Sequence, residues 1–303
     1  MTENNDQFKN FKSGFAAIIG APNVGKSTLL NTMIGEKISI TSQKPQTTRN
    51  RIAGVVHLPD SQIVFLDTPG IHKSKKTLNK QIVEVAMAAI SDVDIVLLVI
   101  DASSPDPASE ALIINKINEY KNLPIILAIN KIDLVKKPKL LKFIDQWAKK
   151  YSFEEIIPIS ALEGTQTDIL MSAMQSLLPP GPPYFPEDII TDMPERFIAS
   201  EMVREQVFHL TKQEVPFSTA VTIESFKEDA DRKLVRIHAA IHVEHNSQKG
   251  IIIGKQGSML RTIGEAARLD IQRMVGTKVL LKLFVRVEKN WSKKARSLRK
   301  LGY

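Results

Sequence analysis

A glycine-rich loop near the N-terminus strongly limits how this chain can fold. It reads Gly20-Ala-Pro-Asn-Val-Gly-Lys-Ser27 and stands between an apolar run at residues 15–19 and a helix pattern that begins at Lys26. Gly20 and Gly25 allow the backbone to curl so that its N–H groups point at an anion, and the helix N-terminus adds positive potential. Lys26 would contact the β- and γ-phosphates, and Ser27 would bind Mg²⁺. The pattern predicts a strand, a phosphate-binding loop and a helix, and hence binding of a nucleoside triphosphate.

The composition is that of an ordinary globular chain with a basic end. A length of 303 residues suggests about two domains. Cysteine is absent, which excludes disulfides and zinc–thiolate sites, and no apolar run approaches the roughly 18 residues of a membrane span. Residues 248–303 hold 14 Lys and Arg against 3 Asp and Glu, in a chain of net charge +8. This concentration of charge predicts contact with nucleic acid or another anionic surface.

Strand patterns and helix patterns alternate through residues 14–178. The strand patterns fall at residues 15–19, 52–57, 63–67, 94–100, 124–130 and 156–159. The helix patterns lie between them, at residues 26–34, 78–90, 108–119, 138–150 and 168–177. Several of the strands are continuous apolar runs, which is typical of strands covered on both faces. This order predicts a doubly wound α/β sheet whose ligand site is formed by loops at the carboxyl ends of the strands.

Two loops in this region carry side chains that could respond to a bound triphosphate. Residues 38–51 form a long polar stretch without periodicity, which includes Thr47 and Thr48, and either threonine could reach Mg²⁺. Asp67-Thr68-Pro69-Gly70 follows the third strand. The Asp67 carboxylate could hold Mg²⁺ through water, and the Gly70 N–H could contact a γ-phosphate. We therefore expect the second loop to be a switch that rearranges with the nucleotide.

Two further loops predict which base is bound. Asn130-Lys131-Ile132-Asp133 follows the fifth strand, and Ser160-Ala161-Leu162 follows the sixth. The Asp133 carboxylate can accept hydrogen bonds from guanine N1–H and N2–H₂, a donor pair that adenine lacks. Asn130 would orient its loop, the Lys131 stem would cover the ring, and the Ala161 N–H would lie near guanine O6. A wrong base would leave Asp133 unpaired at a cost of ~1–3 kcal/mol, so the two loops predict GTP rather than ATP.

A proline-rich run at residues 179–183 marks a change of organisation, because it cannot continue a helix and forms a stiff, extended linker. Beyond it the element order becomes α-β-β-α-α-β. Helix patterns fall at residues 195–210, 247–253 and 258–274, and strand patterns at 219–226, 235–243 and 278–287. A polar turn at residues 228–232 separates the first two strands, and residues 289–299 are a candidate basic helix.

The loop Gly254-Lys255-Gln256-Gly257 stands between the helix patterns at residues 247–253 and 258–274. Such a turn lets the backbone approach a nucleic-acid backbone, and KH domains use it to clamp about four nucleotides of single strand. The preceding Ile252 and Ile253 suit an apolar groove for unstacked bases. Two cations share one face of the last strand: Lys282 and Arg286. The loop, the element order and the basic charge together predict a KH-type RNA-binding domain.

In this order and over about residues 14–290, the motifs resemble the Era family of bacterial GTPases. The resemblance rests on Gly20–Ser27, Gln46-Thr-Thr-Arg49, Asp67–Gly70, Asn130–Asp133, Ser160–Leu162 and Gly254–Gly257. It implies a P-loop GTPase sheet followed by a smaller α+β type II KH domain. We expect a flexible N-terminus at residues 1–13, a GTP-binding domain at 14–178, a linker at 179–193, a KH domain at 194–288 and a basic tail at 289–303.

The resemblance also implies roles for individual residues. Ser27 and Thr48 match direct Mg²⁺ ligands, Asp67 matches a ligand that acts through water, and Asn23 matches a residue that can hold K⁺. Lys26, Thr48 and Gly70 are the expected catalytic residues. The expected GTP contacts are Gly20, Ala21, Pro22, Asn23, Val24, Gly25, Lys26, Ser27, Thr28, Asp67, Thr68, Pro69, Gly70, Ile71, Asn130, Lys131, Ile132, Asp133, Ser160, Ala161 and Leu162.

Ile71 predicts the rate of the reaction. It stands where Ras-like enzymes carry the glutamine that orients the attacking water, and the family shares this apolar residue. An isoleucine side chain makes no hydrogen bond to water, so slow intrinsic hydrolysis of GTP to GDP and phosphate is expected. Water would then be placed by backbone groups, the metal or the partner.

The resemblance implies a cytoplasmic switch that binds 16S ribosomal RNA near its 3′ end and assists assembly of the 30S subunit. It also implies a peripheral association with the inner membrane, and we expect a monomer. Two other interpretations stay open at this point. The chain could be an RNA-binding assembly chaperone with GTP as a structural ligand, or a membrane-surface GTPase whose basic tail contacts anionic lipid.

Overall fold

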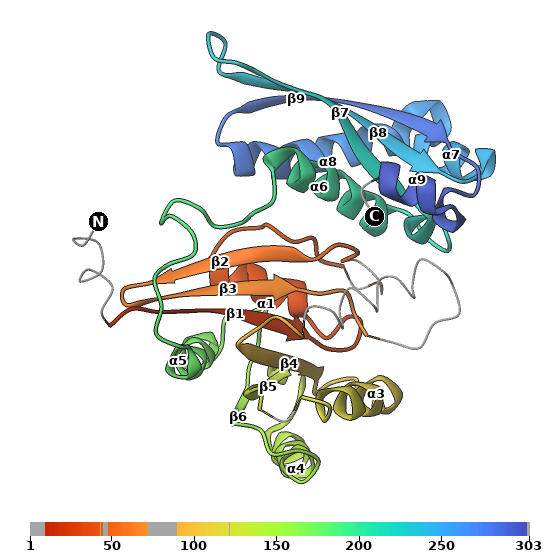
Figure 1. The fold of residues 1–303 in the computed structure, drawn as a ribbon. Coiled ribbons are helices and arrows are strands. Elements are labelled where there is room, and N and C mark those ends of the chain that lie inside the picture. Colours follow the sequence, from red (N-terminus) through yellow and green to blue (C-terminus); the bar gives the residue numbers. More distant parts are fainter. Residues whose placement is uncertain (1–9, 43, 45–47, 72–89, 121, 302–303) are drawn as a thin grey trace. The chain divides into compact units, whose positions relative to one another are not determined.

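A computed structural model describes residues 10–42, 44, 48–71, 90–120 and 122–301 (Figure 1). The chain divides into two compact units. The first comprises Met1–Thr41 and Thr48–Asp192, and the second comprises Ser42–Thr47 and Met193–Tyr303. The helix predicted at residues 78–90 lies, except for Ile90, outside the described residues. Among the helices of the described part, none has both the length and the hydropathy needed to cross a bilayer.

The first unit is built on a six-stranded sheet with the order β2-β3-β1-β4-β5-β6. β2 pairs antiparallel with β3, and all other neighbours pair in parallel. The strands are β1 (Lys12–Ile19), β2 (Ile52–Leu58), β3 (Ser61–Asp67), β4 (Ile95–Asp101), β5 (Ile125–Asn130) and β6 (Glu155–Pro158). The sheet confirms the predicted α/β class. Because β1 begins at Lys12, two residues predicted to be flexible belong to the sheet instead.

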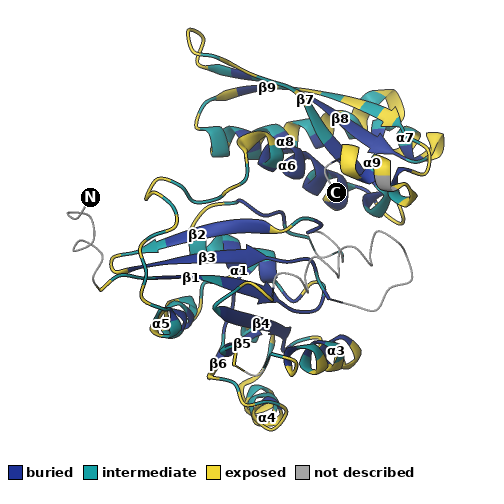
Figure 2. Cartoon of the chain, in the orientation of Figure 1, coloured by how far each residue is buried: buried dark blue, intermediate teal, exposed yellow. Residues whose placement is uncertain are grey.

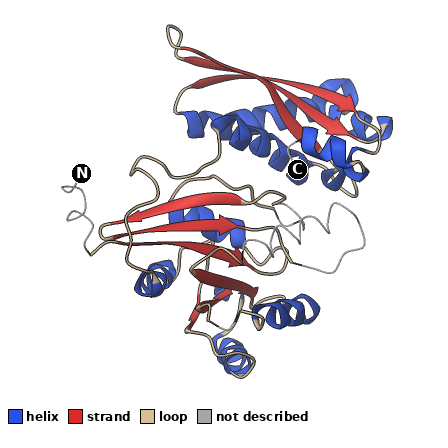
Figure 3. Cartoon of the chain, in the orientation of Figure 1, coloured by secondary structure: helices blue, strands red, loops and turns tan. Residues whose placement is uncertain are grey.

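Helices cover the strands whose sequences are continuously apolar (Figure 3). The described helices of this unit are α1 (Lys26–Ile34), α3 (Pro107–Ile117), α4 (Lys137–Ala148) and α5 (Thr167–Leu177). Every residue of β3, β4 and β5 is buried, as expected for strands packed on both faces. One core cluster joins β4 and β5 to Ile113 and Ile117 of α3 and to Trp147 of α4.

The carboxyl edge of this sheet gathers the polar residues that the sequence singles out. Asp67 ends β3, Asp101 ends β4 and Asn130 ends β5. The glycine-rich loop follows β1, which lies between β3 and β4. Because parallel strands end at the same edge, the loops predicted to bind phosphate, metal and base lie together there.

Residues 179–192, called the strap below, are attached to the first unit. Val55 N of β2 donates to Ile190 O at 2.8 Å, and the segment forms an antiparallel bridge at Gly54. Gln62 of β3 is fully buried, and its side chain bonds three backbone groups: Tyr184 N at 2.7 Å, Phe185 N at 3.0 Å and Phe185 O at 2.7 Å. The segment that the sequence predicts as a stiff, extended linker is therefore packed along β2 and β3.

The second unit has a three-stranded sheet with the order β7-β8-β9, in which β7 and β8 are antiparallel and β8 and β9 are parallel. Its elements are α6 (Glu195–Leu210), β7 (Ala220–Asp229), β8 (Leu234–Val243), α7 (Asn246–Ile253), α8 (Ser258–Val275), β9 (Lys278–Val287) and α9 (Ala295–Lys300). The predicted order α-β-β-α-α-β is confirmed.

Every second residue of β8 faces the core of the second unit. Val235, Ile237, Ala239, Ile241 and Val243 are buried and pack against apolar side chains of α6 and α8. The two helices lie on one side of the sheet (Figure 1), and the exposed residues of β9 are visible in Figure 2. The period-two pattern of β8 therefore assigns one face of the sheet to the core.

The C-terminal segment differs from the continuous basic helix predicted at residues 289–299. It forms a 3₁₀ turn at Trp291–Lys293, an extended residue at Lys294 and then the short helix α9. Trp291 is fully buried, and its Nε1 donates to Ser218 O at 3.0 Å. Leu298 and Leu301 are buried as well. These apolar side chains attach the segment to its own unit, because leaving them in water would forfeit their hydrophobic burial.

Candidate functional site

The loop between β1 and α1 has a backbone that can surround a phosphate. Asn23 and Gly25 have φ angles of 64° and 99°. A Cβ at Gly25 would stand 2.3 Å from Asn130 Nδ2, so the close approach of these two loops requires glycine. Asn130 Nδ2 also donates to Val24 O at 2.8 Å. The predicted phosphate loop and the predicted base loop are thereby joined directly.

Lys26 supplies a buried positive charge to this loop. Its Nζ donates to Gly20 O at 3.1 Å and to Ala21 O at 2.9 Å. Burial lowers the pKa of Lys26 to about 8, and the nearby charge of Asp67 opposes this shift only in part. A desolvated ammonium interacts more strongly with an anion than one in water does. Lys26 is therefore well placed to neutralise phosphate oxygens.

Asp67 forms a cluster of oxygen atoms beside the loop. Its Oδ2 accepts hydrogen bonds from Ser27 at 2.7 Å, Ser39 at 2.9 Å and Thr48 at 3.5 Å, and Ser27 Oγ lies 2.9 Å from Thr48 Oγ1. Of the two candidate threonines, Thr48 reaches the cluster. Thr47 lies outside the described residues. Ser39 was not identified from the sequence, because a serine in a polar stretch has no distinguishing spacing.

The electrostatics of this cluster fit a divalent cation. Burial raises the pKa of Asp67, and the charge of Lys26 and the three hydroxyl groups oppose that shift. Asp67 Oδ1 is buried and has no hydrogen-bond partner among the described residues. Mg²⁺ prefers hard oxygen ligands and keeps several waters. The Ser27 and Thr48 hydroxyls, beside a buried carboxylate with an unpartnered oxygen, meet that preference.

The segment after β3 packs closely against the phosphate loop. Thr68 Oγ1 donates to Ile18 O at 2.7 Å, and Pro69 is buried. A Cβ at Gly70 would stand 2.7 Å from the Pro22 backbone, so the two loops approach as closely as glycine allows. Ile71 N donates to Gly20 O at 3.0 Å. The Ile71 side chain is fully buried in the core, so it supports the loop and does not face the phosphate position.

Asn130 organises the loops predicted to recognise the base. Its Oδ1 accepts hydrogen bonds from Lys131 N at 2.8 Å and Ala161 N at 2.9 Å. The Ala161 N–H expected near guanine O6 is therefore directed at Asn130. Asp133 is exposed in the 3₁₀ turn Ile132–Leu134, and its carboxylate makes no hydrogen bond with a described residue. Ser160 is buried and Leu162 is exposed.

Asp101, which no sequence motif marks, holds a residue of the predicted base loop. Its Oδ2 bonds Lys131 Nζ at 2.5 Å, and Lys131 Nζ also donates to Asn23 O at 2.8 Å. Burial would raise the pKa of Asp101, but hydrogen bonds from Lys131 and Ser103 and the charge of Lys131 lower it below its ordinary value. The ionised carboxylate thus fixes the Lys131 stem beside the phosphate loop. A lone aspartate at a strand end has no motif that would reveal this role.

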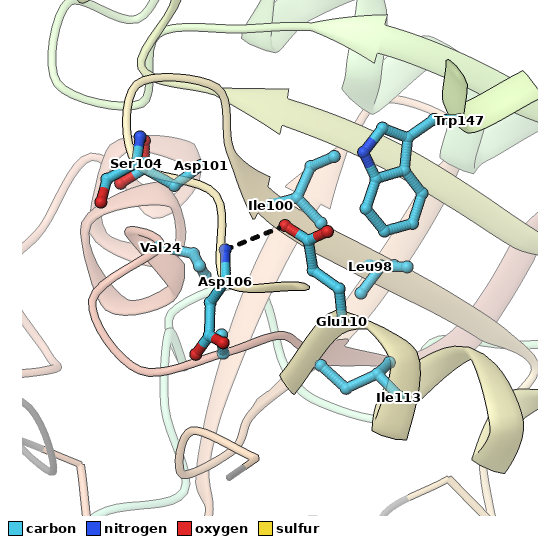
Figure 4. Close-up of a pocket in the computed structure, with 10 residues that line it drawn as sticks. Val24, Leu98, Ile100, Asp101, Ser104, Asp106, Glu110, Ile113 and Trp147 are labelled. Atoms are coloured by element: carbon cyan, nitrogen blue, oxygen red, sulfur yellow. Dashed lines mark hydrogen bonds between the residues drawn. The ribbon is translucent and has the colours of Figure 1, made fainter. Parts of the chain in front are cut away.

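A small cavity of about 10 Å³ lies behind the phosphate loop, between β4, α3 and α4 (Figure 4). Its lining includes Glu110, whose Oε1 accepts a hydrogen bond from Asp106 N at 3.2 Å, and Trp147. A volume of this size admits about one water molecule and no nucleotide. The nucleotide site is therefore the open loop edge, and this cavity belongs to the supporting core.

The Gly-x-x-Gly loop of the second unit is presented between α7 and α8. Gly254, Gln256 and Gly257 have positive φ angles of 71°, 52° and 79°. Lys255 and Gln256 are exposed, as a nucleic-acid contact requires. The structure corrects the prediction for Ile252, whose side chain is fully buried in the core and cannot touch a base. Ile253 is partly exposed, and two residues of β9 are exposed on the sheet: Lys282 and Arg286.

Comparison with known proteins agrees with both units. A family model described as a 50S ribosome-binding GTPase matches residues 15–131, and a KH-domain model matches residues 214–292. GTPase Era of Geotalea uraniireducens is 54% identical over 295 residues, covering 97% of this chain and 99% of the relative. GTPase Era of Geobacter metallireducens is 54% identical over 293 residues, covering 97% of this chain and 98% of the relative.

Two solved structures are similar over almost the whole chain. A variant of Aquifex aeolicus Era bound to GDP and AlF₄⁻ matches with a TM-score of 0.92 and 43% identity, covering 97% of this chain and 99% of that one. An Era complex with MgGDPNP and nucleotides 1506–1542 of 16S ribosomal RNA matches with the same score, identity and coverage.

The fold and the loop-edge site define a P-loop GTPase joined to a KH domain. The relatives are similar over nearly their full length, well beyond the shared GTPase core. The chain belongs to the GTPase Era family, and it hydrolyses GTP.

Proposed function

We propose that the GTPase cycle of the first unit controls binding of the second unit to small-subunit ribosomal RNA near its 3′ end, and that this assists 30S assembly. One observation carries the proposal: a single chain presents both a guanine-nucleotide site and an exposed Gly-x-x-Gly loop. The related Era complex that contains MgGDPNP and a 16S RNA fragment supports it. A ribosomal partner would imply that the protein acts in the cytoplasm.

GTP would bind across the loop edge of the six-stranded sheet. The phosphates would lie within Gly20–Thr28, and Asp133 would bond guanine with help from Asn130, Lys131, Ile132, Ser160, Ala161 and Leu162. Ser27 and Thr48 would hold Mg²⁺ directly and Asp67 through water. When bound, the ion would offset negative charge on the β- and γ-phosphates. Asn23 would hold K⁺, and that ion would add further positive charge.

Hydrolysis needs little covalent chemistry from the protein. Water attacks the γ-phosphorus, the bond to the bridging oxygen of GDP breaks, and inorganic phosphate leaves. Lys26 would neutralise charge on the transferring group, and the Gly70 N–H would contact it. The buried Ile71 side chain cannot orient the water. The intrinsic rate is therefore slow, and water is positioned by backbone groups or by the bound partner.

RNA would bind at the loop between α7 and α8. The backbone of Gly254–Gly257 would approach the ribose–phosphate chain, Lys255 would add charge, and Ile253 would contact a base. Lys282 and Arg286 on β9 would contact further phosphates. The single-stranded segment held by the loop itself would be about four nucleotides long.

The decisive experiment measures affinity for a single-stranded 16S 3′-end RNA with a GTP analogue, with GDP and without nucleotide. A switch requires different affinities in the three states. Gly257→Glu should abolish RNA binding and leave GTP affinity unchanged. Gly35→Glu is the matched control, because Gly35 has a similar φ of 82° and open space around it. Equal RNA affinity of Gly257→Glu and the unmodified protein would refute the KH assignment.

The assembly-chaperone alternative makes a different prediction for the same measurement. If GTP is only a structural ligand, RNA affinity will be identical with the GTP analogue and with GDP. The membrane alternative would depend on the exposed basic side chains of the C-terminal segment, because its apolar residues Trp291, Leu298 and Leu301 are buried.

A further inference from the structure

β9 carries a regular alternation of cationic and apolar side chains on one face. Lys278, Leu280, Lys282, Phe284 and Arg286 are all exposed, whereas the residues between them pack toward the core formed with α6 and α8. Side chains of a strand alternate between faces, so these five share the face opposite the helices. Leu280 is 44% exposed and Phe284 is 46% exposed, and Lys282 lies between them on this face.

β8 widens this row into a surface. In the parallel register Arg236 lies beside Leu280 and His238 beside Lys282. The His238 ring packs edge-on against Phe284, with centroids 6.1 Å apart and planes at 75°. We call the set Arg236, His238, Lys278, Leu280, Lys282, Phe284 and Arg286 the outer face. It places an aromatic pair and a leucine among cations.

Protection of a sheet edge explains only half of this pattern. β9 is an edge strand, and lysine or arginine on an edge opposes unwanted strand pairing. Exposed Leu280 and Phe284 have the opposite effect, because they add apolar surface to that edge. The apolar half of the alternation therefore needs another explanation.

The charges of the outer face are partly uncompensated. Arg236 pairs with Asp229 at 3.1 Å, and Arg286 pairs with Glu224. Lys278 and Lys282 form no ion pair with any residue that the structure describes, and both are exposed. The two lysines are thus available to an anionic ligand on either side of Leu280.

We propose that the outer face is a second surface for single-stranded RNA, with bases stacked on Phe284 and His238 and phosphates beside Lys278 and Lys282. Cations interleaved with stacking side chains are the chemistry by which proteins bind single strands without sequence preference. An anionic lipid surface would also attract the lysines and could take up the apolar side chains, and the vesicle measurement described below distinguishes the two ligands. This inference rests on the RNA binding proposed above and extends it to a different surface.

The path between the two RNA surfaces follows from the topology of the second unit. α8 begins next to the Gly-x-x-Gly loop, and its last residues lead directly into the start of β9. Since α8 and β9 are packed together and joined by a short turn, they run in opposite directions. The loop is therefore near the Arg286 end of β9. A strand that leaves the loop would meet Arg286 first and then Phe284 and Lys282.

The test uses the full chain with two single-stranded oligouridine probes, one of about 4 nucleotides, the length that the loop alone clamps, and one of about 12. Phe284→Ala should weaken binding of the longer probe by about 5-fold or more, as the loss of one base stack does, and leave the shorter probe unaffected. Phe284→Tyr should restore binding. Leu269→Ala is the matched control, because Leu269 is an exposed apolar residue (47%) of α8 outside the face.

Lys282 provides an independent readout. Lys282→Ala should reduce the slope of log affinity against log salt by about 0.7 for the longer probe, the effect of one lost phosphate contact on a single strand. Lys139→Ala, which removes an exposed lysine of α4, should leave that slope unchanged.

The outcomes separate this inference from the proposed function. Unchanged binding of both probes by Phe284→Ala and Lys282→Ala, with binding abolished by Gly257→Glu, would overturn the outer face and keep the loop. No effect from any of the three variants would overturn both. Lys282→Ala protein that loses binding to vesicles of anionic lipid but binds the longer probe normally would assign the face to membrane and contradict the proposal.

Discussion

At the scale of single residues, the nucleotide site depends on contacts between loops that are far apart in the sequence. Asn130 bonds Val24 O, Lys131 N and Ala161 N, so one side chain fixes three loops. Asp101 holds Lys131 against Asn23 O. These residues hold the loops of the nucleotide site in place. The loops approach most closely where a glycine leaves room for them.

Gly25 offers the clearest test of that arrangement. Gly25→Ala would place a Cβ 2.3 Å from Asn130 Nδ2 at a φ of 99°, so the loops must separate. We expect GDP affinity to fall by at least about 10-fold, a change equivalent to ~1.4 kcal/mol. Gly35→Ala has a comparable φ of 82° with open space, so it should cost about 1–2 kcal/mol of stability and leave GDP affinity unchanged. Equal nucleotide affinities of the two variants, measured by calorimetry, would contradict this account.

The sequence revealed the site residues whose chemistry requires a fixed spacing. The phosphate loop, Asp67–Gly70 and Asn130–Asp133 each combine a residue type with a place at a strand end, and the fold brings all three to one edge. Asp101 and Ser39 lack such spacing. The prediction for Ile252 was wrong because neighbouring residues of a short helix point in different directions, and the sequence alone does not show which one faces the core.

At the scale of elements, the sheet of the second unit joins its strands through buried polar contacts as well as its core. His242 of β8 is buried, with its Nε2 2.8 Å from Thr222 Oγ1 of β7 and its Nδ1 3.4 Å from Glu288 Oε2 after β9. Burial lowers the pKa of His242 below 6.5, and the charge of Glu288 opposes that shift in part. Arg286 and Lys300 add to the lowering, and Glu224 opposes it.

The direction of this shift predicts loss of stability in acid. Because the unfolded chain protonates His242 more readily than the folded one, stability is fully present above pH 6.5 and decreases as the pH falls below it. Hydrogen exchange of β8 amides should therefore speed up as the pH falls below about 6.5, after correction for the intrinsic rate. His242→Gln should flatten that dependence, and the exposed control His209→Gln should retain it. An unchanged profile in His242→Gln would rule out this source of acid sensitivity.

The sequence predicted elements correctly where their periodicity or capping is strong. It did not predict which segments pack against distant parts of the chain. The bounds of α1, α6 and β9 agree with those expected from their patterns. Prolines show that residues 179–183 are not helical, but they do not show that the strap pairs with β2. Basic residues likewise masked the few apolar side chains that attach the C-terminal segment.

At the scale of the whole molecule, the strap is one covalent route between the two units. It ends at Asp192, where the second unit begins at Met193. Gln62, which holds it, belongs to β3, and β3 ends at Asp67 in the nucleotide site. A movement of β2 and β3 that accompanies the nucleotide state would therefore reach the strap directly. Coupling between distinct sites requires an element of this kind that both sites can bias.

Gln62→Ala tests this route. It removes three hydrogen bonds to the backbone of the strap, each worth about 0.5–1.5 kcal/mol, and leaves buried groups without partners. Coupled sites typically change each other's affinity by about 5- to 150-fold, and the factor is the same whether RNA or nucleotide binding is measured. We expect Gln62→Ala to bring toward 1 both the factor by which nucleotide changes RNA affinity and the factor by which RNA changes nucleotide affinity. GTP affinity measured without RNA should stay unchanged.

Two measurements make the result unambiguous. Hydrogen exchange of residues 184–190 should increase in Gln62→Ala, which confirms that the strap has been released, and Gln146→Ala, an exposed glutamine of α4, should alter neither exchange nor coupling. If the strap is released and RNA still discriminates the GTP analogue from GDP by the original factor, the signal does not pass through Gln62. Nucleotide and RNA would then still change each other's affinity after the strap is released. The coupling would have to arise from direct contacts made by the bound RNA.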